Sequence, residues 1–275
     1  MTQAKNGHPT QPAKQTSLSA NYLQRFSGLL RLFGEDGLHA LANASVAVIG
    51  IGGVGVWAAE ALARSGINNI TLIDLDDIAT SNINRQLHAM SSTIDQGKVE
   101  VMQTRINDIN PDCQVEAIED FVTPDNVSEY LTQAFDVVID AIDSVSAKVA
   151  IIAHCKRQKI KLVTVGGAGG QINPLQITSG DLAKTKQDPL LAKVRSELRR
   201  KHRFSSNPQR RFSIEAIYST EQLRYPTSDG QVSFEKSNSQ GASKMDCSTG
   251  FGAFVGVTAT FGFIAASRAI AHITK

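Results

Sequence analysis

The chain has 275 residues, of which 41% are hydrophobic and 20% charged, with a formal net charge of +2 at pH 7. This composition excludes a disordered or collagen-like chain and is typical of a globular protein with a sizeable core. Cys113, Cys155 and Cys247 lie far apart and form no CxxC pair. The sequence therefore predicts neither a disulfide framework nor a zinc site, and it favours reduced thiols in a cytoplasmic protein.

The first 20 residues differ in character from the rest of the chain. Residues 1–20 are polar and lack the apolar stretch of a signal peptide, so we expect a disordered tail. Residues 21–275 are expected to form a single domain. It begins with helical apolar spacing over residues 22–41, interrupted around Gly34 and Gly37.

Short β-branched runs then alternate with amphipathic segments over residues 45–180. This alternation predicts an α/β fold, a Rossmann-like doubly wound sheet that is mostly parallel. The expected strands are 45–50, 69–74, 113–119, 136–143 and 161–167, and the expected helices are 56–66, 98–109, 125–133 and 147–158.

The alternation stops after about Gly180. Residues 181–245 are polar and loop-like, and we expect a basic insertion there. The chain then becomes apolar over about 250–272, with no charge from Gly250 to Ser267. That length is close to the minimum for a membrane span, but small residues at helical spacing favour a helix buried against the sheet or a partner subunit over a membrane span.

A glycine-rich turn joins the first expected strand to the following helix. Its glycines allow backbone amides to approach a phosphate at the helix N-terminus, and they are Gly50, Gly52, Gly53 and Gly55. Asp74 ends the second expected strand, where an acidic side chain accepts hydrogen bonds from a ribose. The pattern predicts a nucleotide site over the alternative of a tight turn with no ligand. By itself it would favour a dinucleotide such as NAD.

The residues beyond the second strand favour ATP over NAD. Polar and charged groups are concentrated there, and a nicotinamide ring needs an apolar slot instead. Arg and Lys side chains would neutralise charge on a pyrophosphate leaving group, and Asp143 in DAID would hold Mg²⁺ together with phosphate oxygens. The group consists of Asp74, Asp76, Asn82, Arg85, Gln86, Lys98 and Asp143.

These residues resemble the ubiquitin-activating-enzyme-like superfamily, which includes the adenylyltransferases of molybdopterin and thiamine biosynthesis. The resemblance rests on GxGGxG, DxDxxxxSNxxRQ, a following Lys and DAxD. It implies that Asp74 binds ribose, that Asn82, Arg85 and Lys98 contact phosphates, and that Asp143 binds Mg²⁺. It also implies a homodimer in which Arg25 reaches the partner's site. The alternative for Arg25 is a solvated position on a helix.

Further segments are similar to one branch, the bacterial tRNA threonylcarbamoyladenosine dehydratases. They are GGAGGQINP, DLAKTKQDPL, STEQLRYP and MDCSTGFGAFVGVTATFGF. The branch implies ATP-dependent cyclisation of threonylcarbamoyladenosine beside the anticodon, through an acyl-adenylate and release of AMP. It also implies a partner from a cysteine-desulfurase system. Cys247 in MDCSTG is open to a nucleophilic role, although a structural role is favoured because ring closure needs no covalent enzyme intermediate.

Charge patterning independently supports an RNA substrate. Residues 184–211 hold ten Lys or Arg against Asp188 and Glu197. Such a segment attracts a phosphate backbone, although a solvated helix face or an acidic protein partner would also fit it. The tRNA-binding candidates are Arg195, Arg199, Arg200, Lys201, Arg203, Arg210 and Arg211.

Three other functions compete with this one. An adenylyltransferase for a ubiquitin-like sulfur carrier is the nearest, but the absent CxxC pairs and the basic segment disfavour it. A non-enzymatic scaffold would not need Arg85, Lys98 and Asp143. An NAD oxidoreductase is disfavoured by the charges beside the phosphates. The scattered histidines, among them His39, His88 and His154, show no ligand spacing and receive no role.

Overall fold

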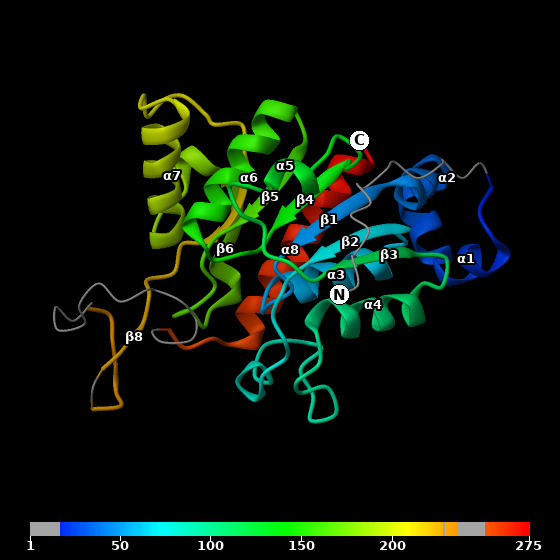
Figure 1. Ribbon diagram of the computed structural model, residues 1–275, viewed down its shortest axis with the longest axis horizontal. Coiled ribbons are helices and arrows are strands. Elements are labelled where there is room, and N and C mark those ends of the chain that lie inside the picture. Colours follow the sequence, from blue (N-terminus) through cyan, green and yellow to red (C-terminus); the bar gives the residue numbers. More distant parts are fainter. Residues whose placement is uncertain (1–16, 228, 236–250) are drawn as a thin grey trace, which may run out of the picture.

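The structure of the chain is a computed structural model that describes residues 17–227, 229–235 and 251–275 (Figure 1). Among these residues, seven strands form one sheet in the order β3-β2-β1-β4-β5-β7-β6. All neighbours pair in parallel except β6, which is antiparallel to β7. The predicted doubly wound, mostly parallel α/β fold is confirmed.

The strands of the sheet are β1 (Ser45–Ile49), β2 (Asn69–Ile73), β3 (Gln114–Ile118), β4 (Val137–Asp140), β5 (Lys161–Val165), β6 (Ile177–Asp181) and β7 (Glu215–Ser219), and β8 (Tyr225–Pro226) pairs with β9 (Val232–Ser233) in a separate hairpin. The helices are α1 (Ala20–Arg25), α2 (Ser27–Asn43), α3 (Gly55–Arg64), α4 (Lys98–Ile109), α5 (Val127–Tyr130), α6 (Val145–Gln158), α7 (Pro189–His202) and α8 (Val255–Ile273), with 3₁₀ turns η1 (Thr80–Asn82), η2 (Pro174–Gln176) and η3 (Leu182–Lys184).

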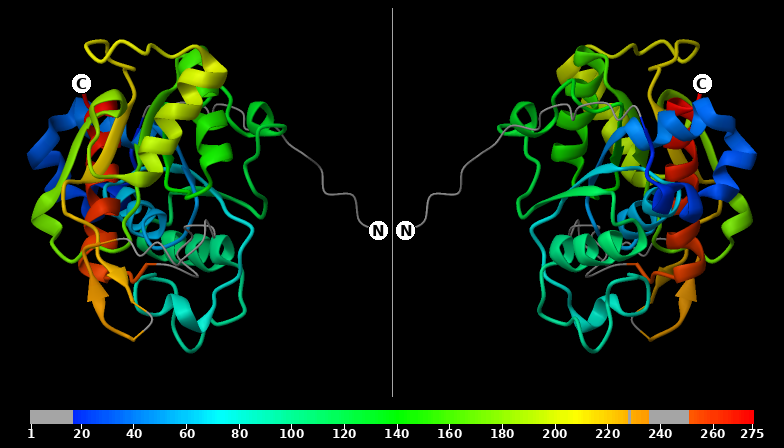
Figure 2. Two further views of the ribbon diagram at one scale, coloured as in Figure 1. Left: turned by 90° about the vertical axis from the view of Figure 1, so that its left-hand side faces the viewer. Right: turned by 90° about the vertical axis from the view of Figure 1, so that its right-hand side faces the viewer.

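Helices cover both faces of the sheet (Figure 2). One core contains the apolar side chains of α3, α4 and α8, and the other contains those of α5, α6 and α7. Every residue of β1 is buried, because this strand lies in the middle of the sheet. Strands β2 and β3 lie on one side of β1, and β4 lies on its other side, so the order of the strands reverses at β1. A crevice for a ligand is expected at such a switch point, outside the carboxyl ends of the strands.

The first helix begins earlier in the sequence than expected, at Ala20. Residues 1–16 of the predicted tail lie outside the described residues, but Ser19 caps α1 through its side chain and also donates to Asp112 at 2.6 Å. The Tyr22 hydroxyl donates to the Gly66 carbonyl at 2.5 Å, which anchors α1 to the end of α3. The predicted helical interruption at Gly34 is confirmed, since its φ of 74° is non-helical.

The prediction of a loop-like stretch over residues 181–245 is wrong where the structure describes it. Helix α7 buries Leu191, Val194 and Leu198, and β7 is inserted between β5 and β6. The apolar residues that define α7 are only three per two turns among many charges, so the basic composition concealed the helical spacing. The predicted helix 125–133 is also too long, since α5 covers only Val127–Tyr130.

The C-terminal apolar segment forms α8, which packs against α3 and the sheet as expected. A Cβ at Gly262 would lie 2.5 Å from the Val54 carbonyl oxygen and 2.7 Å from Trp57 Cβ, so the small residue permits this close approach. Within the described part of the chain, α8 is the one helix with the length and composition of a membrane span. Packing against α3 buries one face of α8, and 39% of its most apolar stretch is buried within the structure.

Candidate active site

The phosphate loop, residues 50–55, connects β1 to α3 and depends on two of its glycines. Gly50 has a φ of 84°, in the left-handed region that glycine favours. A Cβ on Gly55 would lie 1.8 Å from the Gly50 carbonyl oxygen, so only glycine permits this tight entry into α3. The Val56 and Trp57 amides of the first turn donate to the Gly52 and Val54 carbonyls. The N-terminus of α3 carries partial positive charge, so the loop can bind a phosphate there.

The other two predicted glycines, Gly52 and Gly53, are less constrained by the protein itself. A Cβ at Gly52 would have Gln86 Nε2 as its nearest neighbour, at 3.9 Å, which is ordinary van der Waals contact. A Cβ at Gly53 would meet the Arg85 side chain at 3.3 Å, which is only slightly tight. The fold therefore does not demand glycine at position 52, in contrast to position 55. The role of Gly52 in binding the nucleotide stays a prediction, in which the bare backbone leaves room for a phosphate.

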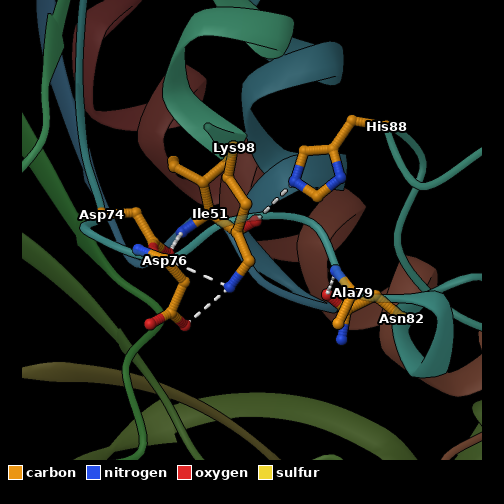
Figure 3. A network of polar contacts seen from close by, with 7 residues as sticks. All are labelled: Ile51, Asp74, Asp76, Ala79, Asn82, His88 and Lys98. Atoms are coloured by element: carbon orange, nitrogen blue, oxygen red, sulfur yellow. Dashed lines mark hydrogen bonds and ion pairs between the residues drawn. The ribbon is translucent and has the colours of Figure 1, made fainter. Parts of the chain in front are cut away.

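Asp74 follows β2 and holds the phosphate loop in place (Figure 3). Its Oδ2 accepts a hydrogen bond from the Ile51 amide at 2.6 Å, and its Oδ1 accepts one from the Asp76 amide at 2.9 Å. Burial raises the pKa of Asp74, and the positive charge of Lys98 opposes this shift. Each carboxylate oxygen has a second lone pair, so these backbone contacts leave acceptor capacity for the predicted ribose hydroxyl.

Lys98 is the first residue of α4 and points back between the two aspartates of the DxD motif (Figure 3). Its Nζ lies 2.7 Å from Asp76 Oδ2 and 3.7 Å from Asp74 Oδ1. The Lys98 side chain is 6% exposed, whereas that of Asp76 is 56% exposed. The ammonium group is therefore held at the crevice by a carboxylate that solvent can reach, which suits a cation that contacts phosphates.

His88 belongs to the same network, and sequence reasoning gave it no role (Figure 3). The ring is buried, and its Nε2 lies 2.9 Å from the Ile51 carbonyl oxygen. Because a carbonyl only accepts, Nε2 must carry the proton. Burial lowers the pKa of His88 to about 4, so the ring is neutral at pH 7. The Ile51 residue is thus held from both sides, by Asp74 at its amide and by His88 at its carbonyl.

Residues 82–86 place a polar segment over the phosphate loop. Asn82 accepts a hydrogen bond from the Ala79 amide at 3.0 Å, which shapes the turn and leaves the NH₂ group of Asn82 available. The Arg85 side chain passes over Gly53, close to its Cα. Gln86 is buried and its Oε1 has no hydrogen-bond partner among the described residues. The segment therefore brings a guanidinium and amide groups to the loop.

Asp143 lies in the loop between β4 and α6, and the predicted strand 136–143 is too long. Strand β4 ends at Asp140, whose side chain is fully buried in an ion pair with Lys148 at 2.8 Å and accepts from Thr164 at 2.7 Å. The first Asp of DAID is therefore structural. Asp143 is exposed, and the Ala141 backbone and the Ile142 side chain of the same loop lie against Gly50.

The structure thus brings the predicted nucleotide residues together at one edge of the sheet, where β1, β2 and β4 end. Arg25 lies elsewhere in the same subunit. Its Nη1 donates to the Ile109 carbonyl at 3.2 Å, at the end of α4 remote from Lys98. Arg25 is therefore at the opposite edge from the phosphate loop of its own chain. Its placement in a partner's site stays a prediction.

The candidate RNA-binding residues also lie away from the phosphate loop and differ among themselves. Arg195 is half-buried and donates to the Thr185 hydroxyl, and Arg199 lies over the Phe212 ring at 5.5 Å. Arg200 and Lys201 form ion pairs with Glu197 on the surface of α7. The exposed candidates outside α7 are Arg203, Arg210 and Arg211.

The cysteines give no nucleophile in the described part of the chain. Cys113 and Cys155 are free and buried, and burial raises the pKa of each thiol to about 12. The thiolate is the reactive form, so both are inert near neutral pH. Cys247 lies outside the described residues, and its role stays open.

Comparison with known proteins connects this site to a family. The ThiF family profile matches residues 25–275. The chain belongs to the ThiF family. Within it, the chain is 53% identical over 253 residues to the tRNA threonylcarbamoyladenosine dehydratase of Escherichia coli (strain K12), covering 92% of this chain and 94% of that protein. It is 55% identical over 255 residues to the enzyme of that name from Haemophilus influenzae, covering 93% and 95%.

A solved structure gives the same result at the level of the fold. The E. coli tRNA N6-threonylcarbamoyladenosine dehydratase in complex with ATP matches with a TM-score of 0.83 and 48% identity, over 94% of this chain and 97% of that chain. The similarity extends well past the phosphate loop and includes the basic segment and α8. The ThiF-family site described above is therefore part of a molecule whose full length is shared with this relative.

Proposed function

We propose that this ThiF-family chain uses ATP to dehydrate threonylcarbamoyladenosine in tRNA, closing a ring on the nucleoside beside the anticodon. The carrying observation is similarity over 92% of the chain to a tRNA threonylcarbamoyladenosine dehydratase, together with an intact phosphate site. Residues that cradle a nucleotide and residues that neutralise phosphates occur at one crevice. That arrangement suits activation of a carboxylate by ATP.

The first proposed step is adenylation. A carboxylate oxygen of the threonyl group attacks the α-phosphorus of ATP, the bond to the β-phosphate breaks, and pyrophosphate leaves. Negative charge builds on pyrophosphate. Arg85 lies beside Gly53 of the phosphate loop. Lys98 pairs with Asp74, which binds that loop at Ile51. Held by Asp76, Lys98 needs little reorganisation when this charge develops, which favours the transition state.

The second step is ring closure. A nitrogen of the carbamoyl group attacks the acyl carbon, AMP leaves with the bonding electron pair, and the nitrogen proton passes to solvent. The net reaction removes one water from the nucleoside and converts ATP to AMP and pyrophosphate. No covalent enzyme intermediate forms, so no thiol is needed and Cys247 has no obligatory part. No sulfur is consumed either, so the cycle requires no cysteine-desulfurase partner.

Magnesium is proposed to accompany ATP. Mg²⁺ is usually held by one or two carboxylates together with substrate phosphates. Asp143 fits this role, since it is exposed, directly follows the Ala141–Ile142 segment that contacts Gly50, and forms no ion pair within the described residues. Bound there, the ion would supply charge neutralisation for the phosphates.

We propose a homodimer in the cytoplasm as the working form. Large apolar side chains are exposed at the N-cap of α8, on α8 itself and on η2, which contacts α8: Phe254 at 47%, Phe263 at 47% and Leu175 at 92%. Such side chains are a suitable interface for a second copy of this chain. The buried free thiols of Cys113 and Cys155 are consistent with a reducing compartment. Gel filtration giving only a monomer at micromolar concentration would contradict the dimer.

The alternative function is activation of a ubiquitin-like sulfur carrier. One experiment separates the two. The purified protein is incubated with ATP, Mg²⁺ and tRNA that carries threonylcarbamoyladenosine, and the nucleoside is analysed by mass spectrometry without hydrolysis. ATP-dependent loss of one water supports the proposal. Pyrophosphate release only with a carrier protein ending in Gly-Gly would replace it with the alternative.

A further inference from the structure

A basic cavity lies at the edge of the sheet opposite the phosphate loop. Its volume is about 650 Å³, and Lys156, Lys159, Lys161 and Arg211 are among its lining residues. Lys161 begins β5, whereas the phosphate loop follows the end of β1. The cavity is therefore separated from the nucleotide site by the length of the parallel strands, about 17 Å for five residues.

The acidic residues of the cavity are already engaged by the protein. Asp181 accepts hydrogen bonds from the backbone amides of Ala183, Phe212 and Ser213. Glu215 pairs with Arg268 at 2.5 Å and with His272 at 2.8 Å. Arg268 neutralises Glu215, whereas Asp181 keeps its negative charge because its partners are backbone amides. One carboxylate therefore opposes the three lysines and Arg211 of the cavity.

The basic residues of the cavity are the uncompensated groups. Lys156, Lys159, Lys161 and Arg211 are all exposed, and none forms an ion pair within residues 17–227, 229–235 and 251–275. The carbonyl ends of α6 offset only about half a charge. The cavity keeps a net positive potential that suits an anion.

The segment that follows α7 reaches the cavity at Arg211, which lines it. Helix α7 starts at Asp188, which accepts from the Gly167 amide beyond the end of β5, so α7 runs back toward the cavity edge. Figures 1 and 2 show the end of α7 and its following loop on the side of the molecule away from the cyan loops that follow β2. Arg203 and Arg210 in this loop extend the positive surface from Arg211.

Ile160, Leu162 and Ile214 also line the cavity, but all three are buried and none is an exposed anchor. The exposed large hydrophobic side chains in the described part of the chain lie elsewhere, and none lines the cavity. Protein interfaces depend on buried aromatic or aliphatic anchors, whereas a nucleic-acid backbone is bound mainly by Lys and Arg. The chemistry favours RNA over an acidic protein.

We propose that this cavity binds backbone phosphates of the RNA substrate at a point remote from the nucleoside that is modified. That the RNA is a tRNA rests on the proposed function. One edge of the sheet then carries out the chemistry, and the opposite edge holds a second part of the same RNA. Phosphate contacts of this kind position a nucleic acid without reading its sequence.

The test is a binding titration of the full-length protein with an unmodified tRNA transcript, followed by fluorescence anisotropy at several salt concentrations. The variant is Lys156→Glu/Lys161→Glu/Arg211→Glu. We expect the Kd to rise at least about tenfold and the slope of log K against log salt to fall by about two to three. The isolated anticodon stem–loop should lose less than about twofold, because the cavity is remote from the phosphate loop.

The matched single-residue control compares Lys161→Glu with Arg31→Glu, which makes the same charge change on exposed α2. Lys161→Glu should weaken tRNA binding about threefold, and Arg31→Glu less than twofold. The neutral triple variant Lys156→Ala/Lys161→Ala/Arg211→Ala should also raise the Kd for tRNA, but by a smaller factor. It checks that the effect of the glutamate triple variant does not come from misfolding. An unchanged Kd in both triple variants overturns the proposal, and an equal loss for the stem–loop overturns the remote placement.

Failure of this proposal and of the proposed function are distinguishable. If tRNA binding depends on the cavity but no ATP-dependent water loss occurs, the proposed function fails and the RNA site stands. If dehydration is normal and the triple variants bind tRNA like the wild type, only the cavity proposal fails.

Discussion

The two edges of the sheet differ in how their charges are held. At the phosphate-loop edge, Lys98 is 6% exposed and paired, Asp74 is buried, and His88 is neutral. At the cavity edge, Lys156, Lys161 and Arg211 are exposed and form no ion pair within the described part of the chain. Preorganised charges suit a transition state, whereas mobile surface charges suit a long polyanion. The comparison predicts that substitutions at the first edge change chemistry and those at the second change RNA affinity.

The largest effect is expected at Arg85 and Lys98. Arg85→Ala or Lys98→Ala should lower the rate of ATP-dependent dehydration by about a hundredfold or more, because each removes a cation beside the developing pyrophosphate charge. The measurements are pyrophosphate release and mass spectrometry of the nucleoside, with circular dichroism to check folding. Arg31→Ala serves as the control for loss of one positive charge. Near-normal turnover in both site variants would refute their assignment.

Removing the carboxylate of Asp143 should have the next largest effect. Asp143→Asn should lower kcat about tenfold to a hundredfold, and raising the Mg²⁺ concentration should restore part of it, because one ligand is weakened while the phosphates remain. Titration of the rate with Mg²⁺ measures this. Asp140→Asn is the contrasting variant, since it breaks a buried pair with Lys148 and should lower the thermal midpoint instead. A rate independent of Mg²⁺ in both wild type and Asp143→Asn would contradict the magnesium role.

His88 should act through the phosphate loop. His88→Ala removes the donor to the Ile51 carbonyl, and we expect a roughly tenfold weaker ATP affinity with a smaller change in kcat. His88→Gln offers an NH₂ donor and should recover part of the affinity. Calorimetric titration with ATP separates the two variants. Identical ATP binding in wild type and His88→Ala would show that the contact does not shape the loop.

The same histidine predicts a pH dependence of stability. Burial lowers its pKa from the usual 6.5 to about 4. Between these two pH values the ring is protonated in the unfolded state and neutral in the folded state. Stability should therefore fall as pH drops from about 6.5 to about 4, by up to about 3 kcal/mol. Urea denaturation across this range should show a shallower fall in His88→Gln. If the free energy of unfolding falls equally in the wild type and in His88→Gln, the loss comes from other titrating groups.

The smallest effects are expected within the basic segment itself. Arg195→Ala should cost about 1 kcal/mol of stability, because Arg195 is half-buried and bonds Thr185. Arg200→Ala should cost less stability than Arg195→Ala, because its pair with Glu197 is on the surface, and it should weaken tRNA binding about twofold. Thermal unfolding measures the stability of both variants, and fluorescence anisotropy measures their affinity for tRNA. A reversed order of the two stabilities would contradict the burial argument.

The sequence alone determined the fold class and predicted which residues gather around the phosphate loop, because both depend on local signals. Alternating β-branched and amphipathic segments specify a parallel sheet, and Gly50 and Gly55 are demanded by a turn that no other residue can make. Lys98 and Asp74 followed from the same motif. The carboxyl ends of parallel strands meet at one edge, so residues after β1, β2 and β4 had to converge.

Only the tertiary structure decided the rest. The buried face of α7 and the insertion of β7 between β5 and β6 depend on long-range packing, which a charge-rich sequence conceals. His88 carries no spacing signal, since its partner is a backbone carbonyl 37 residues away. The cavity joins the end of α6, the start of β5 and the loop before β7. Such sites arise where elements distant in sequence pack together, and no local pattern records them.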